Sequence, residues 1–310
     1  MSLRVIFMGT PQFAVPSLSK LYEAGYNIVA VVTAPDKPAG RGMQLTESAV
    51  KKYALEKNLK ILQPEKLKDH AFIEELKLLK ADVQVVVAFR MLPEVVWNMP
   101  PMGTINLHAS LLPQYRGAAP INWAIINGEK QTGVTTFKLK HDIDTGNILL
   151  QEKIEITENE TAGTLHDKMM NIGAELLLQT INELGKGNIE GIVQSSSSIF
   201  KDETLHHAPK IFTETCEINW NNNTNSIHNL IRGLSPYPAA FTFLQGKKLK
   251  IFYAEKEIDN KVIDPGKIFT DNKTFLKFST NDGFISLKEI QLEGKKKMNI
   301  EDFLRGWRGN

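Results

Sequence analysis

The feature that most constrains the fold is a series of short, almost uninterrupted apolar runs in the first half of the chain. Such runs fit strands buried on both faces of a parallel sheet, because a strand with one face in water alternates apolar and polar residues. Helical patterns lie between the runs, as expected of an α/β fold. The predicted strands are residues 4–8, 27–34, 83–89, 103–108 and 132–139, followed by an extended segment at 147–156.

Three segments around these strands have apolar residues at helical spacing. We expect one helix at 16–25 and another at 46–58, with Thr46 as its N-cap. A longer helix is predicted over 161–184, ending before Gly185. Strands and helices together predict a Rossmann-like α/β domain with a mainly parallel sheet.

The second half of the chain has a different pattern. Residues 185–198 are rich in Gly and Ser and poor in core residues, which is typical of a connection. A helix is predicted at 227–234 with Thr224 as a possible cap, and short strands separated by turns such as 281–283 follow it. This pattern predicts a small antiparallel, OB-like β-barrel. The predicted organisation is a catalytic domain at 1–189, a linker at 190–206 and a barrel domain at 207–310.

Charge is divided unevenly between these regions. The net charge of the 310 residues is only +2, so the whole molecule is not a strongly basic nucleic-acid binder. Residues 1–205 carry 21 Lys/Arg and 23 Asp/Glu, whereas residues 206–310 carry 16 and 12. A modestly basic barrel suits a polyanionic partner, although a solvated basic face is an equally good interpretation of the charge alone.

Cysteine and histidine usage argues against several classes of protein. Cys216 is the only cysteine, which excludes an intramolecular disulfide, and the histidines show no metal-ligand spacing, so we expect no metal. The first residues do not have the layout of a signal peptide, and no apolar run is long enough to span a membrane. We therefore expect a cytoplasmic protein with no membrane partner.

The strongest candidate for chemistry is the end of the predicted strand 103–108. Asn106 and His108 are two residues apart, so their side chains point to one face while Leu107 points to the other. Open parallel sheets place ligand sites at such strand ends. An amide N–H and an imidazole N–H that converge on a carbonyl oxygen would stabilise a tetrahedral intermediate. The alternative is that both residues only cap the strand end.

A carboxylate follows on a later loop. Asp144 precedes Thr145 and Gly146 in a tight-turn sequence, and it could act as a base or orient His108. The alternative is an ordinary Asx-turn, and Asp142 is an equally available carboxylate. The spacing does not show that Asp144 meets His108.

The segments that contain Asn106, His108 and Asp144 resemble those of a known family. The run NLHASLLPQYRGAAPI (106–121), followed by DTG at 144–146, resembles the folate-dependent formyltransferases. The resemblance implies transfer of a formyl group from 10-formyltetrahydrofolate to the amino group of methionyl initiator tRNA, in support of translation initiation. It implies that Asn106 and His108 polarise the formyl group and that Asp144 assists proton transfer.

The same resemblance implies two segments that bind the folate. Residues Ser110, Leu111, Leu112 and Pro113 would line its site. Residues Phe89, Arg90, Met91 and Leu92 match the loop that holds the pterin ring, although Arg90 and Met91 stand where small or aliphatic residues are expected. The loop 33–46 resembles the one that engages the acceptor stem of the tRNA, with Lys37 and Arg41 as its cations; a plain surface loop is the alternative.

Other interpretations remain open on the sequence. A hydrolase that splits formyl-folate, or a formyltransferase for a sugar nucleotide or glycinamide ribonucleotide, would need the same Asn106, His108 and Asp144. A non-catalytic RNA-binding protein would have no reason to combine these three residues. We expect a monomer, because two domains of one chain can span a tRNA.

Overall fold

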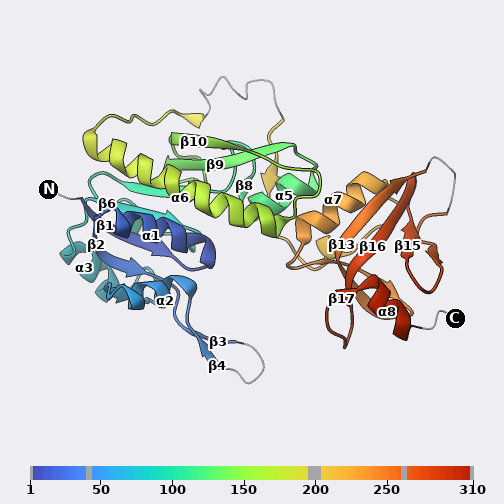
Figure 1. The fold of residues 1–310 in the computed structure, drawn as a ribbon. Coiled ribbons are helices and arrows are strands. Elements are labelled where there is room, and N and C mark those ends of the chain that lie inside the picture. Colours follow the sequence, from blue (N-terminus) through green and yellow to red (C-terminus); the bar gives the residue numbers. More distant parts are fainter. Residues whose placement is uncertain (1–2, 40–43, 195–203, 260–263, 308–310) are drawn as a thin grey trace. The chain divides into compact units, whose positions relative to one another are not determined.

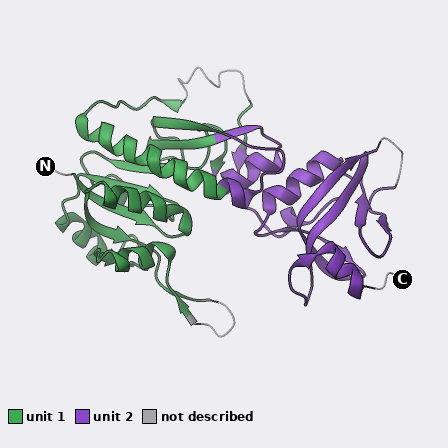
Figure 2. Ribbon diagram, viewed as in Figure 1, with its two compact units in different colours: residues 1–116, 133–154, 166–206 green, residues 117–132, 155–165, 207–310 purple. Residues whose placement is uncertain are grey.

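The computed structural model describes residues 3–39, 44–194, 204–259 and 264–307, and the chain divides into two compact units. Unit 1 comprises Met1–Arg116, Gly133–Ile154 and His166–His206. Unit 2 comprises Gly117–Thr132, Glu155–Leu165 and His207–Asn310. Figure 2 colours the two units green and purple and shows that unit 2 takes two segments from the part of the chain before His207.

Unit 1 is built on a seven-stranded sheet (Figure 1) with the strand order β10-β9-β7-β6-β1-β2-β5. The neighbours β1–β2, β1–β6, β6–β7 and β2–β5 are parallel, which confirms the predicted mainly parallel sheet. The strands are β1 Arg4–Gly9, β2 Asn27–Val32, β5 Ile61–Leu62, β6 Val83–Val87, β7 Thr104–His108, β9 Gln131–Lys138 and β10 Ile148–Glu155.

β9 is the exception within this sheet. It pairs antiparallel with β7, and His108 lies opposite Thr135. The connection that leaves β7 returns to the sheet at the same end, next to His108. β9 therefore starts at that end and runs antiparallel to β7. A return through a crossover helix would instead have given a parallel strand.

Helices cover both faces of the sheet. On one face, alternate residues of β1 and β2 such as Ile6 and Ala30 form a core with Phe72 and Leu76 of α3. On the other face, Leu107 packs against Gly173 of α6, and Thr136 bonds to Thr180 at 2.7 Å. The helices are α1 Val15–Glu23, α2 Ala49–Glu56, α3 His70–Leu78, α4 Glu94–Trp97 and α6 Ala162–Lys186, with a 3-10 turn η1 at Gln12–Ala14.

Two predicted helix boundaries in unit 1 are wrong. α2 begins at Ala49 with Ser48 as its N-cap, because Thr46 belongs to a short strand. That strand, β4 (Gln44–Thr46), forms a hairpin with β3 (Lys37–Ala39). α6 continues through Gly185 to Lys186, since Gly187, with a φ of 71°, is the residue that leaves the helical conformation.

The base of this hairpin is held by polar contacts. The carboxylate of Asp36 bonds to the Lys51 ammonium and to Nε2 of Gln63, the latter at 2.9 Å. The same Gln63 nitrogen donates to the carbonyl oxygen of Ala34 at 2.8 Å. The residues just before β3 are therefore fixed to the rest of unit 1.

Unit 2 contains a curled antiparallel sheet of order β12-β13-β16-β15-β14, with β17 paired to β16 (Figure 1). Its core faces α7 and α8, which contribute Ile231, Leu234, Phe303 and Leu304. This open half-barrel confirms the predicted small antiparallel domain. The elements are α5 Pro120–Ile126, α7 Thr224–Leu234, β12 Ala240–Leu244, β13 Lys247–Ile258, β14 Ile268–Thr270, β15 Leu276–Ser279, β16 Gly283–Leu292, β17 Met298–Asn299 and α8 Ile300–Gly306, with a 3-10 turn η4 at Glu214–Cys216. A short pair, β8 Arg116–Gly117 and β11 His207–Ala208, lies apart from both sheets.

α7 is anchored by residues from the first half of the chain. Nδ2 of Asn122 in α5 donates to the carbonyl oxygen of Gly233 at 2.7 Å. A Cβ on Gly233 would lie 2.6 Å from Ile126, so only glycine allows this close approach. The helix is capped by Asn223 and not by Thr224, whose hydroxyl is buried against Thr280 and Asp282.

No helix among the described residues is long and apolar enough to cross a membrane.

Candidate active site

His108 stands at the carboxyl end of β7 and is 7% exposed. Its Nε2 lies 3.0 Å from the backbone carbonyl oxygen of Tyr115. A carbonyl oxygen only accepts, so Nε2 carries the proton. In the neutral ring Nδ1 is then the lone-pair nitrogen, and it is the atom that can take up a proton.

Asp144 is the carboxylate that Nδ1 faces. Its Oδ2 is 3.9 Å from Nδ1, which is longer than a hydrogen bond but close enough for charge attraction once the ring carries a second proton. Both side chains are largely buried, with exposed fractions of 8% and 13%. The structure thus brings together two residues that the spacing alone could not join, whereas Asp142 is exposed.

The turn that presents Asp144 has an unusual backbone. Asp144 has a φ of 53°, in the left-handed region that Asp and Asn tolerate better than most residues. A Cβ at Gly146 would clash with the carbonyl oxygen of Lys138, so this position requires glycine. The sequence Asp-Thr-Gly therefore has a structural reason.

Asn106 lies two residues before His108 on the same strand and is partly exposed. Its neighbours across the sheet are Val86 and Phe137. Leu107 packs on the opposite face against α6, which agrees with the expected alternation. Asn106 and His108 therefore share one face at the carboxyl end of β7.

The segment Ser110–Pro113 follows His108 and is pinned to β9. The Thr135 hydroxyl lies 2.6 Å from the Ser110 carbonyl oxygen and 3.1 Å from the Leu112 backbone nitrogen. The Ser110 hydroxyl donates to the Gln114 carbonyl oxygen at 2.6 Å. Ser110, Leu112 and Pro113 are buried, and Leu111 is half-buried. The segment is a rigid wall beside His108.

The segment Phe89–Leu92 lies after β6. The Arg90 guanidinium donates to the carbonyl oxygens of Pro64 and Glu65, and burial lowers the pKa of Arg90. Met91 is 73% exposed and Leu92 is buried. Arg90 is thus used to tie two loops together through their backbones.

A cavity of about 500 Å³ opens beside this segment. Phe89 and Arg90 line it together with the exposed Lys37. The other cation expected on the hairpin, Arg41, lies outside the described residues. The remaining lining residues are Thr10, Ala34, Pro35, Asp36 and Glu65.

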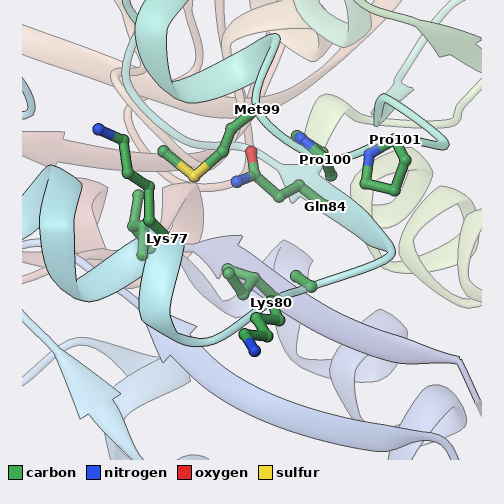
Figure 3. Close-up of a pocket in the computed structure, with 9 residues that line it drawn as sticks. Lys77, Lys80, Gln84, Met99, Pro100 and Pro101 are labelled. Carbon is green, nitrogen blue, oxygen red and sulfur yellow. The ribbon is translucent and has the colours of Figure 1, made fainter.

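A second cavity, of about 270 Å³, lies at the amino ends of the strands, away from His108 (Figure 3). Gln84 near the start of β6 lines it, and in Figure 3 its amide points toward Met99. Among the described residues nothing bonds to Nε2 of Gln84. Because His108 is at the carboxyl end of β7, this cavity is not part of the site.

Three residues at the site were missed by sequence reasoning. Tyr115 acts through its backbone oxygen, which no side-chain pattern reveals. Arg116 and Gln194 bond to each other next to the Asp144 turn. Burial lowers the pKa of Arg116, and the charge of Asp144 partly opposes this. Arg116 belongs to the motif quoted above, but Gln194 lies in the predicted linker, where no signal marked it.

No group of three or more His, Cys, Asp or Glu side chains is placed to hold a metal within the described ranges.

The sequence matches two family models over most of its length. Residues 3–181 match the formyl transferase model, and residues 210–308 match the model of the formyl transferase C-terminal domain. The chain belongs to the formyl transferase family. Within this family, the chain is 55% identical to a methionyl-tRNA formyltransferase of Parabacteroides distasonis, over 99% of this chain and 96% of the relative. It is 49% identical to the methionyl-tRNA formyltransferase of Flavobacterium johnsoniae, over 98% and 96%.

Solved structures of formyl transferases share the fold. A sugar 3N-formyl transferase, WlaRD, aligns with a TM-score of 0.69 at 20% identity, covering 96% of this chain and all of its own. An N-formyltransferase from Helicobacter canadensis aligns with a TM-score of 0.69 at 22% identity and the same coverage. At these identities the likeness extends to the fold alone.

Proposed function

We propose that this formyl transferase moves the formyl group of 10-formyltetrahydrofolate to the amino group of methionyl initiator tRNA, in support of translation initiation. The observation that carries the proposal is the near full-length identity of 47–55% to relatives named methionyl-tRNA formyltransferase. The His108–Asp144 pair at the carboxyl end of β7 supports it, since amide formation needs a group that handles protons near neutral pH.

His108 is the proton acceptor in this proposal. An α-amino group has a reference pKa of about 7.7–8.0 and must be neutral to attack the formyl carbon. Nδ1 of His108 takes the proton that the amine loses as the new C–N bond forms. The resulting imidazolium is stabilised by Asp144 at 3.9 Å. It then returns a proton to the leaving nitrogen of the folate.

Asn106 is the residue that stabilises the formyl oxygen as it becomes negative. While His108 is neutral, its one N–H is committed to the carbonyl of Tyr115. The amide N–H of Asn106 is therefore the donor available before proton transfer. Once His108 has gained its proton, the new Nδ1–H becomes a second donor.

The folate would lie along two segments already fixed in unit 1. We assign Ser110, Leu111, Leu112 and Pro113 to one wall, and Phe89, Arg90, Met91 and Leu92 to the other. The bonds that pin Ser110 to Thr135, and Arg90 to Pro64 and Glu65, make both walls rigid, which favours a preorganised site. In this proposal the residues of the two walls bind the folate but supply no reactive group to the formyl transfer.

We further propose a division of labour along the chain. Residues 1–189 carry the chemistry, 190–206 connect, and 207–310 bind the tRNA together with Lys37 and Arg41 of the segment 33–46. The excess of Lys/Arg in 206–310 supports this assignment. The acting form would be a cytoplasmic monomer.

The experiment compares acceptors with one donor. Purified protein and 10-formyltetrahydrofolate are incubated with methionyl initiator tRNA, with glycinamide ribonucleotide, with a dTDP-linked amino sugar, or with no acceptor. Formylmethionyl-tRNA formed only in the first sample is the expected result. Release of tetrahydrofolate without acceptor would instead identify a hydrolase, and formylation of either small acceptor would refute the tRNA assignment.

A further inference from the structure

Gln194 lies at the start of the connection between the predicted domains, and it is 5% exposed. Its Nε2 donates two hydrogen bonds of 2.8 Å, to the carbonyl oxygens of Asp144 and Gly146. These bonds bracket the turn whose left-handed residue is Asp144. One buried side chain therefore fixes the backbone on both sides of the Thr145 peptide.

The other end of the Gln194 amide is also used. Its Oε1 accepts from Nε of Arg116 at 3.1 Å and from the second guanidinium nitrogen. Arg116 follows Tyr115, whose carbonyl oxygen accepts from Nε2 of His108. Gln194 thus links the turn of Asp144 to the segment Tyr115–Arg116, whose backbone orients His108.

The later part of the same connection bonds to the His108 side of the site. Nδ1 of His206 lies 3.0 Å from the Tyr115 hydroxyl, and the His206 carbonyl oxygen accepts from the Tyr115 backbone nitrogen at 2.8 Å. The Gln114 amide bonds to the His206 backbone nitrogen at 2.8 Å and to the Thr204 carbonyl oxygen at 3.2 Å. Tyr115 is 4% exposed, so these contacts fix a buried residue.

We propose that Gln194 and His206, from the two described ends of the connection, position the His108–Asp144 pair, with Gln194 holding Asp144 and His206 holding the backbone that orients His108. The inference rests on the proposed function, because it assigns these residues to the geometry of that reaction. Proton transfer by a catalytic group is sensitive to small displacements, and the two side chains of this pair lie 3.9 Å apart. Neither Gln194 nor His206 touches the reacting atoms, so both are positioning residues.

The chemistry of Gln194 gives a discriminating substitution. Glutamate has the length of glutamine and accepts from Arg116, but its ionised carboxylate has no N–H to give to Asp144 and Gly146. Gln194→Glu therefore keeps the link to Arg116 and removes the hold on the turn. Gln194→Ala removes both, and Val193→Ala, at an exposed neighbour, serves as the control.

The test uses the full-length protein and two measurements. Turnover and KM are measured for methionyl-tRNA and 10-formyltetrahydrofolate, with thermal unfolding alongside. We expect Gln194→Ala and Gln194→Glu to lower kcat roughly 10- to 100-fold with KM for both substrates unchanged, because misplacement of a catalytic group acts on the chemical step. A glutamate variant with wild-type kcat would overturn the proposal, since it would show that only the link to Arg116 matters.

Hydrogen exchange gives a readout that needs no acceptor. We expect faster exchange at residues 141–149 in both Gln194 variants and at 109–116 in His206→Ala, with no change in Val193→Ala. Unchanged exchange in all variants would reject the positioning role. If the wild-type protein failed to formylate tRNA, the proposed function would fall, whereas the exchange data would still decide whether the connection holds the pair.

Discussion

The placement of the free lone pair of His108 follows from one backbone oxygen. Because the carbonyl of Tyr115 accepts from Nε2, the basic lone pair is on Nδ1, the nitrogen that faces Asp144. Rotation of the ring by half a turn would break the bond to Tyr115 within a buried site. The tautomer is thus set by the seven-residue return of the chain from His108 to Tyr115, and not by a neighbouring acid or base.

Loss of either member of the pair should affect turnover and leave the fold intact. We expect His108→Ala and Asp144→Asn each to lower turnover by roughly 10²- to 10⁴-fold, the range for general acid–base groups. Formylation of methionyl-tRNA, together with thermal unfolding, measures this effect. Asp142→Asn is the matched control, because Asp142 lies on the same loop but is exposed. Near-normal turnover in a folded Asp144→Asn protein would remove Asp144 from the mechanism.

At the scale of elements, α7 combines an apolar face with a buried polar cluster. His228 is 4% exposed, and burial together with the charges of Lys256 and Arg232 lowers its pKa to about 4. Glu158 and the backbone of Ala254 act in the opposite direction. The helix therefore holds an imidazole that is neutral in the folded protein at pH values where the unfolded chain protonates it.

This helix should make stability depend on pH. The unfolded pKa of His228 is about 6.5 and the folded value is about 4, so the unfolded state binds more protons between these values. The contribution is fully present above pH 6.5 and is lost as the pH falls toward 4. Between pH 7.5 and 5 we expect a loss of about 1 to 2 kcal/mol in the free energy of unfolding.

Urea unfolding at the two pH values measures this difference. In His228→Gln the pH-dependent part should shrink by the same amount, because glutamine does not titrate. An unchanged difference between pH 7.5 and 5 in the variant would show that other groups cause the acid sensitivity.

Sequence patterns predicted the elements that depend on apolar periodicity and missed those that depend on contacts distant in sequence. The strands β1, β2 and β6 were predictable because their near-continuous apolar runs are typical of strands buried on both faces of a parallel sheet. The β3–β4 hairpin lies in a segment predicted as a loop. Its pairing is only three residues long, and its base is held by contacts of Asp36 with Lys51 and Gln63 that are distant in sequence.

The candidate site shows the same division between local and distant information. Asn106 and His108 share a strand, so alternation was enough to place them on one face. The meeting of His108 with Asp144 depends on the antiparallel pairing of β9 with β7, which no local pattern contains. Gln194 reaches the turn from fifty residues away in sequence. Its position in a Gly- and Ser-rich stretch gave no sign of a buried role.

At the scale of the whole molecule, unit 2 is not the C-terminal third of the chain by itself. α5 and residues 155–165 pack within unit 2, and the Arg232 guanidinium donates to the carbonyl oxygens of Thr157 and Glu160. Arg232 is 8% exposed, so without these acceptors a buried charge would lose partners.

A fragment cut at the sequence boundary should therefore fold poorly. We expect residues 207–310 expressed alone to unfold at a clearly lower urea concentration than unit 2 in the full chain, because Gly233 and Arg232 lose their contacts with α5 and 155–165. Amide hydrogen exchange of residues 224–234 at increasing urea concentration follows the same helix in both proteins. Equal midpoints would show that these contacts contribute little.

The hairpin and the basic C-terminal region lead to a prediction about the tRNA. Arg41→Ala should weaken tRNA binding, reduce the slope of log affinity against log salt by about 1, and leave formyl-folate binding unchanged, as for a single phosphate contact. Lys80→Ala is the control, because this exposed lysine lines the cavity at the amino ends of the strands. Equal losses of tRNA and folate binding in Arg41→Ala would refute a specific role for the hairpin.

The two segments that unit 2 takes from the part of the chain before His207 also limit how such genes can recombine. The two family models leave residues 182–209 between them, which makes the connection look like a natural junction for exchange between relatives. A chimera joined there would pair the α7 of one parent with the α5 of the other, and Gly233 would face whichever residue the other parent has at the position of Ile126. Parents that differ at these contact positions are therefore expected to give chimeras that are less stable than either parent.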